Sequence, residues 1–237
     1  MKYIFGPLKS RRLGNSLGIN LTPYKTCTFD CVYCQLGRVT HKTMRLKEYV
    51  ASPQVIKELK SWLKAHADEK VDYITFSGSG EPLLHSEIGY LIGQVKKITN
   101  IPVAVITNSF LLTRQKVRKQ ILQADLIIPS LDAVSQDIFR RVDCPLPGIK
   151  VKDIIKSLIC LRKEYKGKIW LEVMLIAGIN DSREHVVSLK KAILRINPDK
   201  IQLNSPVRVT AQPGINAPSA NRLKEIKEFL GDNCQII

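Results

Sequence analysis

Three cysteines, Cys27, Cys31 and Cys34, lie close together in the stretch KTCTFDCVYCQLGR, and their number is informative. A closed structural zinc site takes four protein ligands, and an iron-sulfur cluster is normally held by four cysteines. Three thiolates therefore leave one metal position open, and an open position is a place for chemistry. In a reducing compartment, such a group is more typical of a metal or catalytic site than of a disulfide framework.

Small and polar residues follow each apolar run of the chain, and they form the second set that could do chemistry. The stretches SGSGEP, TNS, SLD, GIND and NSPVR each come directly after such a run. In a parallel βα array all strand ends lie on one rim, where the active sites of such folds are built. We therefore expect one pocket lined by Gly78, Ser79, Gly80, Glu81, Thr107, Asn108, Ser130, Asp132, Asn180, Asp181, Asn204 and Arg208.

The elements that must position these residues alternate between β-type and helical segments. The strands are predicted at 16–21, 71–78, 101–108, 124–132, 168–181 and 198–208. The helices are predicted at 52–67, 86–98, 113–123, 135–141, 150–165, 182–196 and 219–230, the first with Ser52 as N-cap and Pro53 at its first position. A closed eight-fold barrel needs about 250 residues. Six βα units therefore predict a single α/β domain over residues 1–237, a partial (β/α)6 TIM-like barrel with a parallel sheet.

The charge of the chain is strongly positive and unevenly placed. The formal net charge is +16, and residues 1–50 contain nine Lys or Arg against two acidic residues. Residues 51–100 contain six of each. A field of this sign attracts nucleic acid or another anionic partner, although a basic surface can also serve solubility alone. The phosphate or partner contacts that we expect around the cysteines are Arg11, Arg12, Lys25, Arg38, Lys42 and Arg45.

The chain shows no N-terminal pattern of a charged segment followed by an apolar one. Its apolar runs are also far shorter than the roughly 20 residues that span a bilayer. We therefore expect a cytoplasmic protein that does not enter a membrane.

The motif CTFDCVYC, with Tyr33 before its last cysteine, resembles the CxxxCxxC signature of the radical S-adenosylmethionine (radical SAM) superfamily. SGSGEP is similar to the Gly-Gly-Glu-Pro type of motif in that superfamily, with Ser79 between the glycines. The chain as a whole resembles the compact group of Fe-S oxidoreductases related to wyosine synthases. Wyosine synthases have a second cluster on cysteines nearer the N-terminus, whereas no cysteine precedes Cys27 here, which argues against wyosine-type ring formation.

The resemblance implies that Cys27, Cys31 and Cys34 bind a [4Fe-4S] cluster whose fourth iron chelates S-adenosylmethionine. One electron then cleaves the sulfonium and yields a 5′-deoxyadenosyl radical, so a one-electron donor of the flavodoxin or ferredoxin kind is expected. The glycines after the second strand would let main-chain acceptors meet the methionine amino group. Glu81 would tie down that loop or shape the methionine end.

The other rim residues have roles by position. Thr107, Asn108, Ser130 and Asp132 suit the ribose hydroxyls and the methionine ammonium, although Asp132 could equally be a helix N-cap. Asn180, Asn204 and Arg208 are candidates for adenine, ribose or substrate contacts, while turn chemistry is the better interpretation of Asp181.

The sulfur-containing residues outside the motif receive separate interpretations. Cys144 lies in a polar, proline-bounded loop and could be a reactive or substrate-facing thiol. Cys160 is interpreted as part of a helix core, Cys234 as a residue near the terminus without partners, and Met174 as strand core.

Three functions stay open from the sequence. The first is a radical SAM enzyme that acts on RNA, with a tRNA base as substrate. The second is a radical SAM activase or peptide-modifying enzyme that acts on an acidic protein partner. The third is a basic nucleic-acid-binding domain stabilised by zinc on the three cysteines and His41, which explains none of the other rim motifs.

Overall fold

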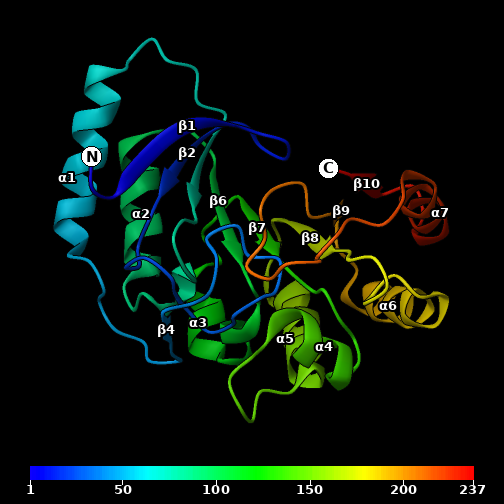
Figure 1. Ribbon diagram of the computed structural model, residues 1–237. Helices are drawn as coiled ribbons and strands as arrows, with labels where there is room; N and C mark the ends of the chain where they lie inside the picture. Colours follow the sequence, from blue (N-terminus) through cyan, green and yellow to red (C-terminus); the bar gives the residue numbers. More distant parts are fainter.

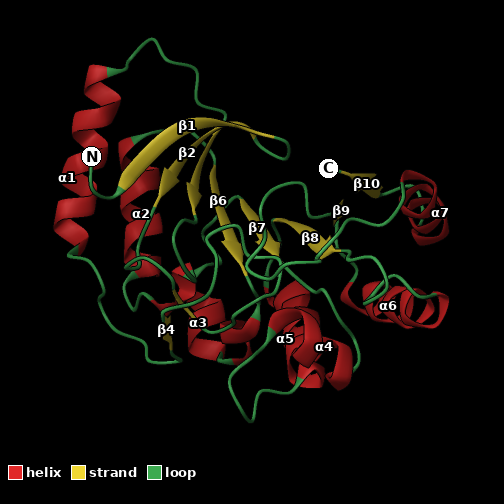
Figure 2. Cartoon of the chain, in the orientation of Figure 1, coloured by secondary structure: helices red, strands yellow, loops and turns green.

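The fold is built on one curved sheet whose helices lie on its outer side. The computed structural model describes residues 1–237. The sheet has eight strands in the order β1-β2-β5-β6-β7-β8-β9-β10, and all neighbouring pairs except β1 and β2 are parallel. Figures 1 and 2 show the helices to the left, below and to the right of this sheet, while the upper side between β1 and β10 has none. The sheet is therefore a partial barrel that does not close.

The six predicted parallel strands are all present, and a seventh follows them. They are β2 (Gly14–Ile19), β5 (Tyr73–Phe76), β6 (Val103–Thr107), β7 (Leu126–Pro129), β8 (Lys168–Met174), β9 (Lys200–Asn204) and β10 (Cys234–Ile236). The predicted helices are α1 (Ser52–Ala65), α2 (Ile88–Ile98), α3 (Gln115–Gln120), α4 (Gln136–Asp143), α5 (Val151–Glu164), α6 (Arg183–Ile196) and α7 (Ala220–Leu230). None of these helices is both long enough and apolar enough to cross a membrane.

Alternation along the strands divides the interior into two different regions. Leu171, Val173, Ile201 and Leu203 belong to the large core of 49 buried residues that lies beneath the helices. The residues between them face the concave side, because side chains alternate along a strand. The concave side has a small apolar cluster at one end, formed by Leu13, Ala104, Leu126 and Ile128. Polar side chains can therefore occupy the remaining positions on the concave side.

Helix starts follow local capping chemistry in three of the predicted helices. Ser135, Ser182 and Ser219 each accept a hydrogen bond from a backbone N–H in the first turn of α4, α6 and α7. The prediction for α1 was wrong by one residue, because Ala51 is its N-cap and Ser52 is already helical. Pro53 still occupies the first turn, where its missing N–H has no cost.

The N-terminal segment forms an edge strand rather than a lid. The strand β1 (Ile4–Ser10) pairs antiparallel with β2, and the Phe5 ring packs against the backbone of Gly18, where a Cβ would clash with it. The tip of this hairpin crosses to the opposite edge of the sheet. There Arg11 donates to the carbonyl oxygen of Ile237 at 2.9 Å and to Asn204 Oδ1 at 3.0 Å. The two ends of the open sheet are thus joined by one guanidinium.

Candidate functional site

The cysteine loop lies at the carboxyl ends of the parallel strands and is held there by its backbone. Cys27 ends the short strand β3 (Thr26–Cys27), which pairs with β4 (His41–Lys42), and Cys31 and Cys34 follow in the loop. The loop then joins the end of α4, because the N–H groups of Asp30 and Val32 donate to the carbonyls of Asp143 and Val142 at 3.1 and 2.9 Å. The thiols are therefore positioned by main-chain contacts that do not involve sulfur.

The turn after β5 packs directly on the start of the cysteine loop. The N–H of Lys25 donates to the carbonyl of Ser79 at 2.7 Å, and the N–H of Glu81 donates to the carbonyl of Thr26 at 3.1 Å. A Cβ on Gly80 would overlap the Thr26 carbonyl oxygen and lie 2.7 Å from the Thr22 hydroxyl. Gly78 has φ +134°, a conformation that favours glycine. Gly80 is thus required by the close approach of two backbones, and Gly78 by its positive φ.

Glu81 connects this turn to the end of β6. Its carboxylate accepts from the Thr107 hydroxyl at 2.7 Å, from the N–H of Asn108 at 2.9 Å and from the N–H of Leu83 at 3.0 Å. Burial raises the pKa of Glu81 to about 7, although these three hydrogen bonds favour the charged form. Glu81 therefore has the loop-tying geometry that was one of its two predicted roles.

Asn108 links the same network to the first cysteine. Its side-chain amide donates to the Thr28 hydroxyl at 2.7 Å and contacts Cys27 Sγ at 3.5 Å. Burial raises the pKa of the Cys27 thiol to about 12, and the neighbouring charge of Glu81 adds to the shift. The amide N–H of Asn108 and the backbone of Thr28 and Phe29 are the groups that can stabilise negative charge on this sulfur.

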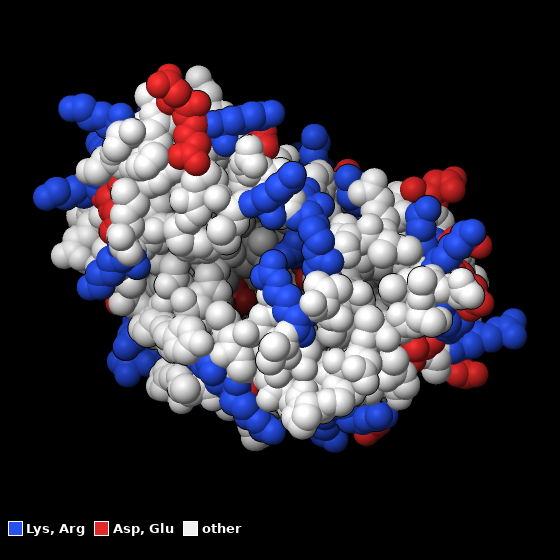
Figure 3. Space-filling view, turned by 45° about the horizontal axis from the view of Figure 1, so that its top comes forward, with Lys and Arg blue, Asp and Glu red and all other residues white.

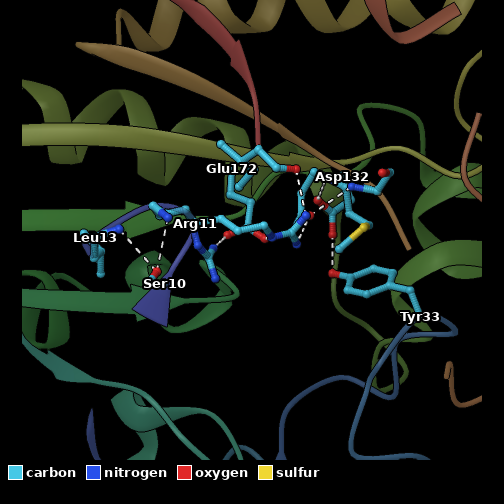
Figure 4. A network of polar contacts seen from close by, with 11 residues as sticks. Ser10, Arg11, Leu13, Tyr33, Asp132 and Glu172 are labelled. Carbon is cyan, nitrogen blue, oxygen red and sulfur yellow. Dashed lines mark hydrogen bonds and ion pairs between the residues drawn. The ribbon is translucent and has the colours of Figure 1, made fainter. Parts of the chain in front are cut away.

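Asp132 lies at the centre of a buried polar group behind the cysteine loop. Its carboxylate accepts from the N–H of Met174 at 2.8 Å and from the Tyr33 hydroxyl, as Figure 4 shows. Burial raises the pKa of Asp132 to about 6. Asp132 is not a helix N-cap, since Ser135 caps α4. Met174 is 6% exposed on its strand, as predicted.

Two acidic residues of this region were not found from the sequence. Asp143 accepts from Cys31 Sγ at 3.5 Å, and burial together with the charge of Asp132 raises its pKa well above the usual range. Glu172 lies on the concave face of β8 and accepts from Asn204 Nδ2 at 3.0 Å. A lone Glu within the apolar run KIWLEVM was a usable signal for Glu172. Asp143 had no such signal in the sequence, because an Asp at the end of a helix is common.

The remaining predicted rim residues lie at strand ends but use their polar groups on the fold. Asn180 is fully buried, donates to the carbonyls of Met174 and Asp132 and accepts from the N–H of Ile176. Asp181 accepts from the N–H of Gly178 at 2.8 Å, which is the predicted turn chemistry. The Ser130 carbonyl accepts from the Ser109 hydroxyl at 2.7 Å. Arg208 lies in the loop after β9 and donates to Gln35 Oε1 at 3.1 Å.

The predicted basic residues divide into an interior group and a rim group. Arg12 forms an ion pair with Glu172 inside the barrel, and burial lowers the pKa of Arg12 to about 10 (Figure 4). Arg11 is exposed and donates to acceptors at the far edge of the sheet, whereas Arg12 points into the barrel; a phosphate or partner contact of either residue stays a prediction. Arg38 is 68% exposed, 3.9 Å from Asp30, and Arg45 is exposed as well.

The rim group surrounds an opening. Lys25 and Lys42 are half-buried, and Lys42 donates to the Cys144 carbonyl at 2.8 Å. Figure 3, which turns the helix-free side toward the viewer, shows a hollow with acidic atoms at its depth and several Lys and Arg side chains around it. Lys and Arg side chains thus surround the opening that leads to the concave side of the sheet.

The other cysteines are placed differently from one another. Cys144 ends α4 with φ +43° and is half-buried, and burial raises the pKa of its thiol, which disfavours the reactive thiolate. Cys160 lies in α5 and is half-buried rather than core. Cys234 belongs to β10, is a free cysteine as expected, and is 1% exposed within the large core.

Comparison with known proteins agrees with this geometry. The family model described as "Radical SAM superfamily" matches residues 21–189. The chain is 35% identical over 237 residues to "UPF0026 protein MJ1312" of Methanocaldococcus jannaschii, a match that covers 98% of the chain and 74% of the relative. It is 28% identical over 225 residues to "Ribosomal RNA large subunit methyltransferase N" of Nitrosopumilus maritimus, covering 89% of the chain and 60% of that protein.

One relative of higher identity is much longer than the chain. A protein named "GTPase Obg" of Brachyspira hyodysenteriae is 42% identical over 235 residues, which are 99% of this chain but 34% of that protein. Among solved structures, a radical SAM methyltransferase from Sphaerobacter thermophilus aligns with a TM-score of 0.71 at 16% identity, covering 94% of this chain and 65% of that one. TYW1 with a lysine-pyruvate adduct bound aligns with a TM-score of 0.67 at 18% identity, over 91% and 72% of the two chains. Both structural likenesses concern the fold.

Proposed function

The chain belongs to the radical SAM superfamily, and on that premise we propose that it cleaves S-adenosylmethionine reductively at a cluster on Cys27, Cys31 and Cys34 and modifies a base in RNA. The observation that supports this proposal most directly is the contact between the cysteine loop and the SGSGEP turn. Two backbone hydrogen bonds and a glycine without room for a Cβ bring these segments together. The three cysteines thus belong to a loop that packs on the glycine-rich turn, and the proposal assigns that turn to the methionine end.

The donor set fits a multi-iron cluster better than a single ion. No three His, Cys, Asp or Glu side chains of the chain are gathered as one metal ion would require. A four-iron cluster has no such requirement, because each thiolate binds a different iron atom. The zinc alternative, which needs Cys27, Cys31, Cys34 and His41 around one ion, therefore has no geometric support.

Enzymes of this superfamily use a [4Fe-4S] cluster and S-adenosylmethionine, which together supply a 5′-deoxyadenosyl radical, and they need an electron donor. In this chain the buried residues around the loop position the ligands and exclude water. Glu81 fixes the turn and the end of β6, while Asp132 and Tyr33 fix the chain between the second and third cysteines. A flavodoxin- or ferredoxin-like donor is part of the proposal.

The assignment of a role to each rim residue is also part of the proposal. Gly78, Ser79 and Gly80 are assigned to the methionine end, and Asn108, Ser130 and Asp132, which follow β6 and β7, are assigned to the same rim. Asn180 and Asn204 are proposed to position neighbouring residues rather than to contact the cofactor, since their side-chain amides already donate hydrogen bonds within the chain. Cys144 is proposed as packing next to the loop rather than as a thiolate nucleophile.

The proposed RNA substrate is supported by charge and by one relative. The net charge is +16, and exposed basic side chains lie around the hollow in Figure 3. The relative from Nitrosopumilus maritimus is named as a ribosomal RNA methyltransferase. An acidic protein or peptide would suit the same positive charge, so the named ribosomal RNA methyltransferase among the relatives is the observation that favours RNA.

The test is anaerobic reconstitution with iron and sulfide, reduction with dithionite and measurement of 5′-deoxyadenosine from S-adenosylmethionine. We expect the product from the wild-type protein. A fully loaded cluster that releases none would contradict the proposed reaction.

RNA binding is tested separately with bulk tRNA and with ribosomal RNA fragments at several salt concentrations. We expect affinity to fall steeply with salt, and Arg38→Gln and Arg45→Gln each to lower the salt slope by about 1. The matched control is the double variant Lys60→Gln, Lys64→Gln on the exposed face of α1. An equal decrease of the salt slope in the control would show that the positive charges act non-specifically, wherever they lie on the surface. No binding at low salt would contradict RNA as the substrate.

Asn108→Ala is expected to shift the reduction potential of the cluster to more negative values. The side-chain N–H lies against Cys27 Sγ, and donors to ligating sulfur favour the reduced state because they stabilise its added negative charge. A potentiometric titration followed by electron paramagnetic resonance measures the shift. Asn100→Ala, at an exposed site between α2 and β6, is the control, and equal potentials in both variants would refute the assigned contact.

A further inference from the structure

Four polar side chains form a layer inside the curved sheet. Arg12, Glu172, Gln202 and Asn204, called here the interior polar layer, come from the hairpin tip, β8 and β9. Glu172 and Gln202 are partners in the parallel ladder, as are Met174 and Asn204. Because Ile201 and Leu203 pack beneath the helices, Gln202 and Asn204 face the concave side.

The interior polar layer lies between an apolar floor and the candidate cofactor site. Two residues before Glu172 on the same face of β8, Trp170 packs on the apolar cluster that contains Leu13. Two residues after Glu172, the backbone of Met174 donates to Asp132. Figure 4 shows the contacts running from the hairpin through Glu172 to Asp132 and Tyr33. A group bound at this level would lie directly beneath the rim.

Three of the four side chains in the layer have partners within the chain. Glu172 receives the Arg12 guanidinium and the Asn204 amide, and Asn204 also accepts from Arg11. Gln202 is the exception, because it is 2% exposed and its Oε1 has no hydrogen-bond partner. Arg12 Nη1 and Glu172 Oε2 have no hydrogen bond either but form an ion pair with each other, whereas Gln202 Oε1 has neither kind of partner. A buried amide oxygen is almost always hydrogen-bonded, so this one needs an explanation.

We infer that Gln202 receives the substrate base, forming two parallel hydrogen bonds with a nucleobase edge that offers a donor beside an acceptor. This inference rests on the proposed function and adds the residue that selects the substrate. A planar amide with one acceptor and adjacent donors is the side chain that pairs in this way with a base edge. Arg12 provides a flat guanidinium beside it, a surface on which bases stack. The carboxylate of Glu172 makes the interior polar layer unsuitable for a phosphate. In this inference the base therefore enters the layer, while the sugar-phosphate backbone of the RNA stays at the basic rim.

The test is anaerobic equilibrium dialysis of the reconstituted protein with adenosine, guanosine, cytidine and uridine, one at a time. Saturating S-adenosylmethionine keeps the nucleosides from its own site. We expect one nucleoside to bind at least about tenfold more tightly than the others, and Gln202→Met to weaken it by about tenfold or more. Gln202→Glu, which keeps the shape but changes the donor, should alter the preference among the four. Gln115→Met is the control, since Gln115 is exposed on α3, outside the curved sheet.

Thermal unfolding separates recognition from a structural role. Gln202→Met should leave the melting temperature unchanged or raise it, because it removes an unpartnered buried amide. A lowered melting temperature, nucleoside binding that is unaffected in Gln202→Met, or no nucleoside binding at all would overturn the inference. Gln202-dependent binding of N-acetylglycinamide in place of nucleosides would also overturn it and point to a peptide. The 5′-deoxyadenosine assay on the wild-type protein reports independently whether the proposed reaction itself fails.

Discussion

Cys31→Ala is expected to abolish release of 5′-deoxyadenosine completely, while Cys160→Ala keeps it at the wild-type level. Cys31 is the middle thiol of the loop, and its Sγ lies 3.5 Å from Asp143 inside the polar group behind the loop. Burial is the main cause that raises the pKa of the free thiol well above its usual range. Without a metal to stabilise the thiolate, this site favours a protonated sulfur. The substitution leaves two cysteines in the loop, and two thiolates cannot hold a four-iron cluster.

The fold should survive the substitution, which makes the result interpretable. The loop on both sides of Cys31 is held by backbone hydrogen bonds from Asp30 and Val32 to the end of α4. Circular dichroism should therefore be unchanged, while the iron content and the visible absorbance of the reconstituted protein fall. Cleavage that persists in Cys31→Ala would show that another residue ligates the cluster. Loss of cleavage in Cys160→Ala, on the half-buried side of α5, would show that the assay reports stability rather than ligation.

Gly80→Ala is expected to produce the second largest loss, a reduction of cluster loading and of S-adenosylmethionine binding. The added methyl would overlap the Thr26 carbonyl, which accepts the N–H of Glu81, so the turn and the cysteine loop must move apart. Overpacking of this kind costs about 1–3 kcal/mol in the free energy of unfolding. Iron content after reconstitution and calorimetric binding of S-adenosylmethionine measure the effect.

Gly93→Ala is the matched control for that substitution. Gly93 lies inside α2, and the nearest atom to an added Cβ is the end of the Gln123 side chain at 3.3 Å, which can move away. Alanine in a helix interior should stabilise the protein by about 0.5–1 kcal/mol. A Gly→Ala substitution is thus predicted to lower the free energy of unfolding at position 80 and to raise it at position 93. Equal behaviour of the two variants would mean that close approach at Gly80 has no role.

The parallel part of the fold was predictable because its signals are local. The strands β2, β5, β6, β7, β8 and β9 are apolar runs that end in small or polar residues, and each helix has its own periodicity and, for α4, α6 and α7, a serine cap. The two-residue strands β3 and β4 have no such pattern. The edge strands were not predictable in this way. β1 contains Gly6, Pro7 and Lys9 and is an edge, while β10 has three residues and depends on its pairing with β9.

The candidate site shows the same division. The cysteine spacing and the strand-end motifs are contiguous in sequence, so the placement of Cys27, Gly80 and Asn108 on one rim followed from the pattern. The partners of Arg12 depend on a hairpin that crosses to distant strands, so no local pattern separates it from an exposed arginine. Glu172 had a local signal, the single Glu within an apolar run, that the prediction did not use, whereas Gln202 is recognised as inward-facing only when the curvature of the sheet is known. That the chain forms a single domain remains a prediction.

The hairpin tip connects two edges of the sheet that no strand pairing joins. The first and last strands have no hydrogen-bond ladder between them. Arg11 instead reaches Asn204 and the carbonyl of Ile237, and Arg12 reaches Glu172. Side chains from two consecutive arginines thus form contacts between strand edges that backbone pairing forms in a closed barrel.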